Sequence, residues 1–166
     1  LLPNKTEEIP ARRNPSQLQD ILHTLGQAKA SGKDQVIKQL HEVAESIKSR
    51  ALVIIYSDFL DDPKSIADVI HHLRDRKHEV VLFHIMDRQE VDFIFDRPTR
   101  FIDLEGGASL LTEPSIIREE YLKQMRIHLN EIKKICTETQ SSHYETITDV
   151  PVHEALKKFS FERTQI

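Results

Sequence analysis

The most apolar run of this chain, with the acidic residues that follow it, reads Ala51-Leu-Val-Ile-Ile-Tyr-Ser-Asp-Phe-Leu-Asp-Asp-Pro63. Its first part, Ala51 to Tyr56, is rich in β-branched residues and too short for a useful helix, so it predicts a strand buried on both faces. Asp62 is placed to cap a helix that starts at Pro63 and continues with apolar residues at helical spacing. Strand, acidic loop and helix in this order open a βαβ unit.

The same stretch indicates where a site would lie. Ligands of open α/β sheets bind beyond the carboxyl ends of the strands, and Asp58, Asp61 and Asp62 fall at that position. The simplest role for Asp61 and Asp62 is to cap the following helix and to interact with its dipole. Any site is therefore expected around Asp58.

Size and charge narrow the class of protein. The 166 residues allow one domain with a real core. Lysine and arginine number 23 against 27 aspartates and glutamates, and the resulting net charge of −4 argues against a nucleic-acid surface. With four glycines in total, neither a Walker A loop nor a dinucleotide fingerprint can be assembled.

Cysteine content and hydropathy indicate a compartment. Cys136 is the one cysteine, so an internal disulfide is impossible and a reducing, cytoplasmic location is expected. No apolar run approaches the roughly 20 residues of a membrane helix. We therefore expect neither a membrane nor a nucleic acid as a partner. Cys136 lies on the apolar line of a predicted helix and is interpreted as core packing.

The rest of the chain reads as an irregular lead-in, residues 1–15, followed by one α/β domain, residues 16–166. Helices are predicted over residues 16–26, 34–47, 63–74, 112–137 and from 151 onward. A second buried strand is predicted at residues 80–85 and another strand at residues 144–149. His84 lies inside the second strand, where a hydrogen-bonded core histidine is the default.

Between residues 91 and 111 the pattern changes to alternation. Val91, Phe93 and Phe95 alternate with Asp92, Ile94 and Asp96, and Gly106-Gly107 is a strong hairpin signal. This segment predicts a small antiparallel meander that either covers the core or docks a partner.

Three segments carry a family resemblance: Ser57-Asp-Phe-Leu-Asp-Asp62, Leu82-Phe-His-Ile-Met-Asp87 and Arg97-Pro-Thr-Arg-Phe-Ile-Asp-Leu-Glu105. With them the chain resembles the C-terminal part of the bacterial von Willebrand factor A-like proteins of domain-of-unknown-function family fifty-eight. The resemblance implies a Rossmann-like parallel sheet of von Willebrand A type whose N-terminal strands are missing here. It also implies association with MoxR-type AAA+ ATPases in the assembly, chaperoning or metallation of partners.

The family resemblance also bears on metal binding. In von Willebrand A domains an Asp-x-Ser-x-Ser motif, a threonine and an aspartate matching Asp58 hold a divalent ion. The present chain has no Asp-x-Ser-x-Ser, and Lys33, in the loop Ser31-Gly-Lys-Asp34, stands where the threonine would be. Because an ammonium group repels a cation and offers no lone pair, only Asp58 is carried over, as the remnant of a ligand set or as a loop hydrogen-bonder. We expect no cofactor, with magnesium only if upstream residues restore the motif.

Two functions follow from these expectations. The first is a non-enzymatic protein-interaction or adaptor domain that works with a MoxR-type ATPase. The rival is a magnesium-dependent phosphoryl-transfer enzyme or hydrolase that uses Asp58, Asp61 and Asp62, with Asp87 and Asp149 as the candidates for a second acidic cluster. Without the first strands of the sheet, the strand from Ala51 to Tyr56 would be an edge, which favours a homo-oligomer through that edge.

Overall fold

The structure is a computed structural model that describes residues 9–10, 13–27, 36–102 and 109–164. Lys33 and Gly106-Gly107 lie outside the described residues. The helices are α1 (Gln17–Gln27), α2 (Val36–Ser46), α3 (Pro63–Asp75), α4 (Arg88–Asp92), α5 (Pro114–Glu138) and α6 (Val152–Thr164). The strands are β1 (Leu52–Ser57), β2 (Glu79–Met86), β3 (Thr99–Ile102), β4 (Ser109–Thr112) and β5 (Ser142–Ile147). The predicted α/β class is confirmed.

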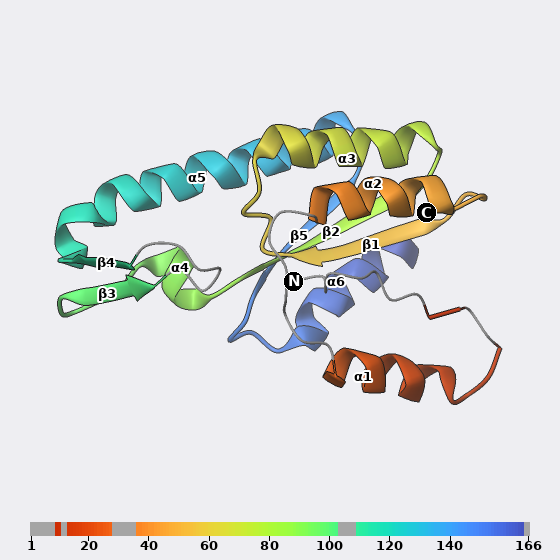
Figure 1. Ribbon diagram of the computed structural model, residues 1–166, viewed down its shortest axis with the longest axis horizontal. Coiled ribbons are helices and arrows are strands. Elements are labelled where there is room, and N and C mark those ends of the chain that lie inside the picture. The colour runs from red at the N-terminus through yellow and green to blue at the C-terminus, as the bar shows by residue number, and fades with distance from the viewer. Residues whose placement is uncertain (1–8, 11–12, 28–35, 103–108, 165–166) are drawn as a thin grey trace.

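Three strands form a parallel sheet in the order β1-β2-β5 (Figure 1). The central strand is β2, and its residues Val80 to Phe83 are all buried. Such a continuous apolar run is typical of a parallel strand covered on both faces. The prediction of a buried strand at this place in the sequence is therefore confirmed.

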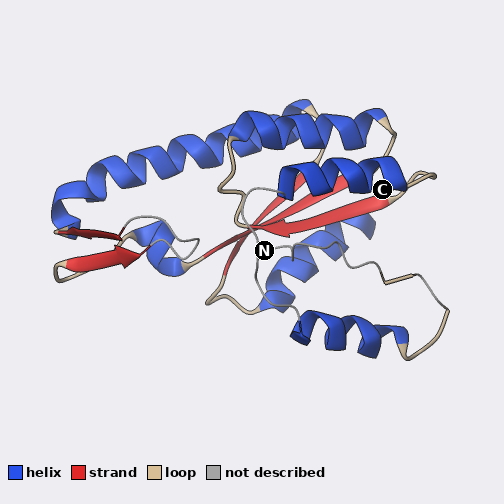
Figure 2. Cartoon of the chain, viewed as in Figure 1, coloured by secondary structure: helices blue, strands red, loops and turns tan. Residues whose placement is uncertain are grey.

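Helices cover the two faces of the sheet unequally. Figures 1 and 2 show α2, α3 and α5 on one face and α6 on the other. The first face holds the main core, in which Ile70 and Leu73 of α3 pack with Leu82 of β2 and Ile132 of α5. On the second face, a smaller cluster is formed by a few residues of β2, β5 and α6, among them Phe83, Tyr144 and Phe159.

The first strand differs from the prediction of burial on both faces. No described strand pairs with the outer side of β1, and Leu52, Ile54 and Tyr56 are 38%, 36% and 57% exposed. These three side chains share the face with the smaller cluster, where α6 covers β2 and β5. The opposite face of β1 behaves as predicted, because Ile55 joins the main core. Among the strands that the structure describes, β1 therefore lies at the edge of the sheet.

The predicted meander is correct only in its second half. Strands β3 and β4 form an antiparallel pair, but the segment that contains Val91 folds into the short helix α4. Asp87 accepts hydrogen bonds at the start of α4 while Glu90 reaches back to the Asp87 backbone, which is a complete capping box. This local signal prevails over the alternation of apolar residues, and α4 ends at Phe93 in a left-handed conformation (φ 47°).

Two further expectations concern single features. Cys136 is buried in the main core, as predicted. Among the described helices, none has the length and apolar content needed to span a bilayer. The division into a lead-in over residues 1–15 and a domain over residues 16–166 stays a prediction.

Candidate functional site

The carboxyl end of β1 leads directly into the residues that the sequence singled out. Asp58 follows β1 and its side chain is exposed. Its carboxylate accepts a hydrogen bond from the Ser57 hydroxyl at 3.4 Å, and the same hydroxyl oxygen accepts the Phe59 N–H at 3.0 Å. The loop amide is thus satisfied by Ser57, so the predicted hydrogen bond from a loop amide to Asp58 is not what the structure shows. We call residues 57–59 the Asp58 loop.

Two histidines from distant parts of the chain fix the backbone of the Asp58 loop. Nε2 of His128, on α5, lies 2.7 Å from the carbonyl oxygen of Phe59. His84, on β2, hydrogen-bonds the backbone of Asp58, and its ring meets the Phe59 ring edge-on at 5.3 Å between centroids. Phe59 is buried and has a left-handed φ of 49°. The loop is therefore anchored while the Asp58 carboxylate stays in solvent.

His84 is neutral in the folded protein. Burial lowers its pKa to about 4, and the field of His143 acts in the same direction, while the hydrogen bond to the Asp58 backbone opposes the shift. Because that bond favours the protonated ring, the imidazole is the donor and a backbone carbonyl the acceptor. Nδ1 of His84 lies 3.3 Å from Nε2 of His143 and, in a neutral ring that already donates, it accepts.

The imidazole of His143, like that of His84, has a lowered pKa. Burial lowers the pKa of His143 more than Glu145 raises it. Lys133 forms an ion pair with Glu145 at 2.6 Å. The sequence interpretation of His84 as a hydrogen-bonded core residue is therefore supported, and the bonds reach from β5 through β2 to the Asp58 loop.

Asp62 has the structural role that its position predicts. Its Oδ2 accepts the backbone N–H of Ser65 at 3.1 Å and the Ser65 hydroxyl at 3.2 Å, so it caps α3. Pro63 occupies the first position of the helix. Asp61 is exposed beside it.

The other two candidate acids are engaged in structural contacts. Asp87 accepts the Gln89 N–H at 2.8 Å and the Thr148 hydroxyl at 3.0 Å. Asp149 accepts two hydrogen bonds from the Arg88 guanidinium, at 2.9 and 3.0 Å, and these lower the pKa of its carboxyl. Both acids therefore tie α4 to the segment after β5, and neither lies unpaired beside Asp58.

The side chains that the structure describes do not form a metal-binding site. Within residues 9–10, 13–27, 36–102 and 109–164, no three His, Cys, Asp or Glu side chains are arranged to hold a metal ion. Of the set that a magnesium site requires, the described structure offers Asp58 as a solvent-exposed carboxylate.

Sequence reasoning missed His128 and His143. His128 precedes the buried Ile132 by one helical turn on α5, so its position on the buried face could have been inferred. Its contact with Phe59 joins residues 69 positions apart and has no local signal. His143 lies opposite Leu82 in the register of β5 and β2, which the sequence does not specify.

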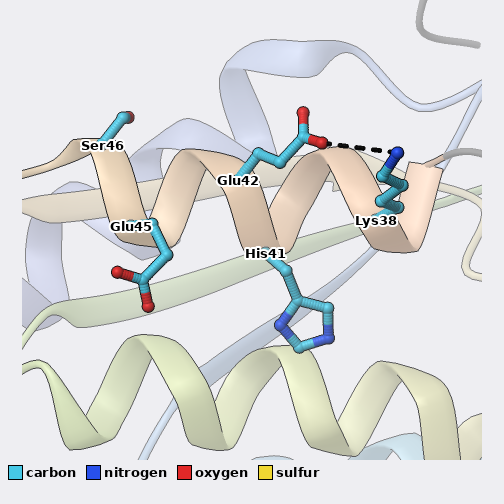
Figure 3. A pocket seen from close by; sticks show the side chains of 5 residues that line it. All are labelled: Lys38, His41, Glu42, Glu45 and Ser46. Carbon is cyan, nitrogen blue, oxygen red and sulfur yellow. Dashed lines mark ion pairs between the residues drawn. The ribbon is translucent and has the colours of Figure 1, made fainter.

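A second polar cluster lies between α2 and α3. A hollow of about 480 Å³ is lined by five residues of α2 (Figure 3): Lys38, His41, Glu42, Glu45 and Ser46. Below it, Nδ1 of His41 lies 2.9 Å from Nδ1 of His72, and the other ring nitrogen of His72 lies 2.7 Å from a Glu45 carboxylate oxygen. Glu45 also pairs with Arg76 at 3.0 Å. These contacts join the two helices.

Comparison with known proteins gives one family. No curated protein and no solved structure matches the chain. The family described as "Protein of unknown function DUF58" matches residues 2–131. This span is more than half of the 166 residues. The chain therefore belongs to the DUF58 family.

Proposed function

We propose that this chain is a non-enzymatic protein-interaction domain of von Willebrand A-like architecture that works in the cytoplasm. As an adaptor, it pairs a MoxR-type AAA+ ATPase with client proteins during their assembly or chaperoning. The ATPase partner rests on the family resemblance of the Ser57–Asp62 and Arg97–Glu105 segments. The contact site rests on the geometry of the Asp58 loop.

The observation that carries the proposal is an exposed carboxylate on an anchored backbone. His84 and His128 hold the carbonyl groups of Asp58 and Phe59, so the loop loses little conformational freedom when a partner binds. A carboxylate presented in this way suits an arginine or lysine of the partner, since charge-assisted hydrogen bonds are the stronger ones. The anchored loop thus presents the Asp58 carboxylate to a partner in a preorganised position.

The test is calorimetric binding of the chain to the purified MoxR-type ATPase encoded in the same genome. We expect Asp58→Ala to weaken binding by roughly tenfold, as the loss of one charged hydrogen bond would. Asp68→Ala is the matched control, because Asp68 is an exposed acid on the outer side of α3. An ATPase that does not bind, or binds the Asp58→Ala variant as well as the parent chain, would contradict the proposal.

The enzyme alternative is tested by a magnesium and manganese titration of the same chain. A site of millimolar or tighter affinity that disappears in Asp58→Asn would favour magnesium-dependent phosphoryl transfer or hydrolysis at Asp58, Asp61 and Asp62. Heats indistinguishable from dilution, together with binding of the ATPase, would favour the adaptor.

A further inference from the structure

Two histidine rings from different helices meet between α2 and α3. Nδ1 of His41 lies 2.9 Å from Nδ1 of His72, and the ring centroids are 5.2 Å apart. Figure 3 shows His41 and Glu45 pointing from α2 toward α3. Nε2 of His72 lies 2.7 Å from one carboxylate oxygen of Glu45, and the other oxygen accepts a hydrogen bond from Arg76 at 3.0 Å. We call the two rings the His41–His72 pair.

The bonding partners of the pair determine where its protons lie. An ionised carboxylate only accepts hydrogen bonds, so Nε2 of His72 donates to Glu45. In a neutral His72 ring, Nδ1 then carries a lone pair. Nδ1 of His41 is therefore the donor between the rings, and Nε2 of His41 is unprotonated. In the neutral state, two hydrogen bonds thus connect α2 to α3.

The contact between the rings is compatible with one added proton but not with two. When His72 is protonated, both of its nitrogens donate, and Nδ1 of His41 can accept if the His41 proton lies on Nε2. When both rings are protonated, each Nδ1 carries a hydrogen, so two donors face each other at 2.9 Å. The two positive charges also repel each other. The second proton therefore breaks the contact.

The charged groups near the rings offer no substitute for this contact. They come from both helices: Lys38, Glu42 and Glu45 from α2, and Asp68 and Arg76, one turn before and one turn after His72, from α3. Lys38 pairs with Glu42, and the Glu45 carboxylate is shared between His72 and Arg76. Among the described residues, no charged group of α5 or β2, which also pack against α3, bonds either ring. A second positive charge on the pair thus has no acid of its own.

We propose that the His41–His72 pair is a pH-sensitive switch, which holds α2 against α3 and releases it when both rings are protonated. Histidine is the side chain whose ordinary change of charge falls between about pH 5 and 8. The released state binds the second proton and the paired state does not, so a falling pH favours release. Release exposes the apolar residues of α2 that pack against the main core: Ile37, Leu40 and Ala44.

Hydrogen exchange of the α2 amides between about pH 8 and about pH 5 tests the switch. After correction for the intrinsic effect of pH on exchange, protection of residues 36–46 should fall by about tenfold toward the acidic end. Residues 129–138 of α5 are the reference, because global unfolding would expose both helices. Unchanged protection of α2, or an equal loss in the two helices, would overturn the proposal.

His41→Asn and His71→Asn form a matched pair of variants. Asparagine carries an amide donor and acceptor where histidine has Nδ1, it does not titrate, and its helix propensity is similar. His41→Asn can bond His72 in either protonation state, so α2 should stay protected over the whole pH range. His71 is exposed on α3 beside His72, and its replacement should leave the behaviour of the parent chain unchanged. A parent-like loss of protection in His41→Asn would contradict the switch.

The ring nitrogens give a further test on the unmodified chain. At about pH 8, nitrogen NMR shifts should show His41 protonated at Nδ1 and His72 protonated at Nε2. The opposite tautomer of His41 would overturn the bonding pattern from which the switch is inferred. The described contacts of the two rings do not include the Asp58 loop, so the switch does not rest on the adaptor function. An ATPase that does not bind would refute the adaptor and leave the switch intact.

Discussion

Phe59 and His128 join the Asp58 loop to the middle of α5, because the His128 Nε2–H donates to the Phe59 carbonyl across 2.7 Å. Phe59 has a left-handed backbone, φ 49°, which costs a non-glycine residue about 1 kcal/mol or more. Burial of its ring beside His84 and the bond from His128 offset that cost. The conformation of the loop is thus maintained from outside the loop.

Replacement of His128 by alanine should loosen the Asp58 loop. The Phe59 carbonyl would lose its donor, and we expect the free energy of unfolding to fall by about 1 to 2 kcal/mol. Hydrogen exchange of the amides in residues 57–60 should accelerate. His128→Gln retains a donor and should lose less. Urea denaturation and exchange mass spectrometry measure both effects, and identical behaviour of the two variants would exclude the bond as the anchor.

The buried imidazole of His84 should make stability depend on pH. Its pKa is about 4 in the folded chain and 6.5 when unfolded, so the unfolded state binds more protons between these values. Stability should therefore fall as the pH drops from 6.5 to 4 and level off below, with a total loss of roughly 3 kcal/mol.

Urea denaturation at several pH values tests this expectation, with His84→Gln as the comparison. The variant cannot titrate at this position, so its free energy of unfolding should change less between pH 7 and pH 4 than that of the parent chain. His143 acts in the same direction, since its pKa is also lowered, and leaves a smaller residual slope. An unchanged pH dependence in the variant would contradict the assignment.

The fold was most predictable where local and tertiary signals agree. Asp62 and Pro63 start α3, and its buried residues lie at helical spacing, so the helix could be predicted almost to the residue. The apolar runs of β1 and β2 look alike in sequence, yet β2 is central and β1 is an edge. The apolar composition of a strand shows that it can be buried. Whether it is buried depends on the segments that pack beside it, and these lie elsewhere in the chain.

The candidate site shows the same limit. Asp58 could be placed at the carboxyl end of β1 because strand ends are readable from the sequence. The anchors of its loop, His84 and His128, come from β2 and α5 and meet only after the sheet and α5 have packed. At α4 the signal is local, because Asp87 and Glu90 form a capping box, and it prevails over the neighbouring alternation of apolar residues.

Cys136 should be unreactive until the protein unfolds. The thiol is buried, and burial raises its pKa to about 11, so little thiolate exists at neutral pH. We expect labelling by a disulfide reagent to be slow in buffer and rapid in denaturant. Labelling is measured by the absorbance of the thiolate that the reagent releases. Fast labelling of the folded chain would mean that the C-terminal part of α5 opens readily.

Asp87 and Asp149, which tie α4 to the segment after β5, should contribute unequally to stability. Asp149 pairs with Arg88 at the surface, where both side chains are about half exposed, so Asp149→Asn should cost less than 1 kcal/mol. Asp87 caps α4 and also accepts the Thr148 hydroxyl, so Asp87→Ala should cost about 1 to 2 kcal/mol. Thermal denaturation of the two variants compares them, and the reverse order would contradict this account.

Two leucines in amphipathic helices should respond very differently to the same substitution. Leu73 of α3 is 1% exposed in the main core, whereas Leu22 of α1 is 60% exposed. Leu73→Ala should reduce the free energy of unfolding by about 2 to 5 kcal/mol through lost contacts and a cavity. Leu22→Ala should change it by less than about 0.5 kcal/mol, because its side chain gains little from folding. Urea titrations give both values under one set of conditions. A large loss for Leu22→Ala would show that the apolar side of α1 is covered in solution.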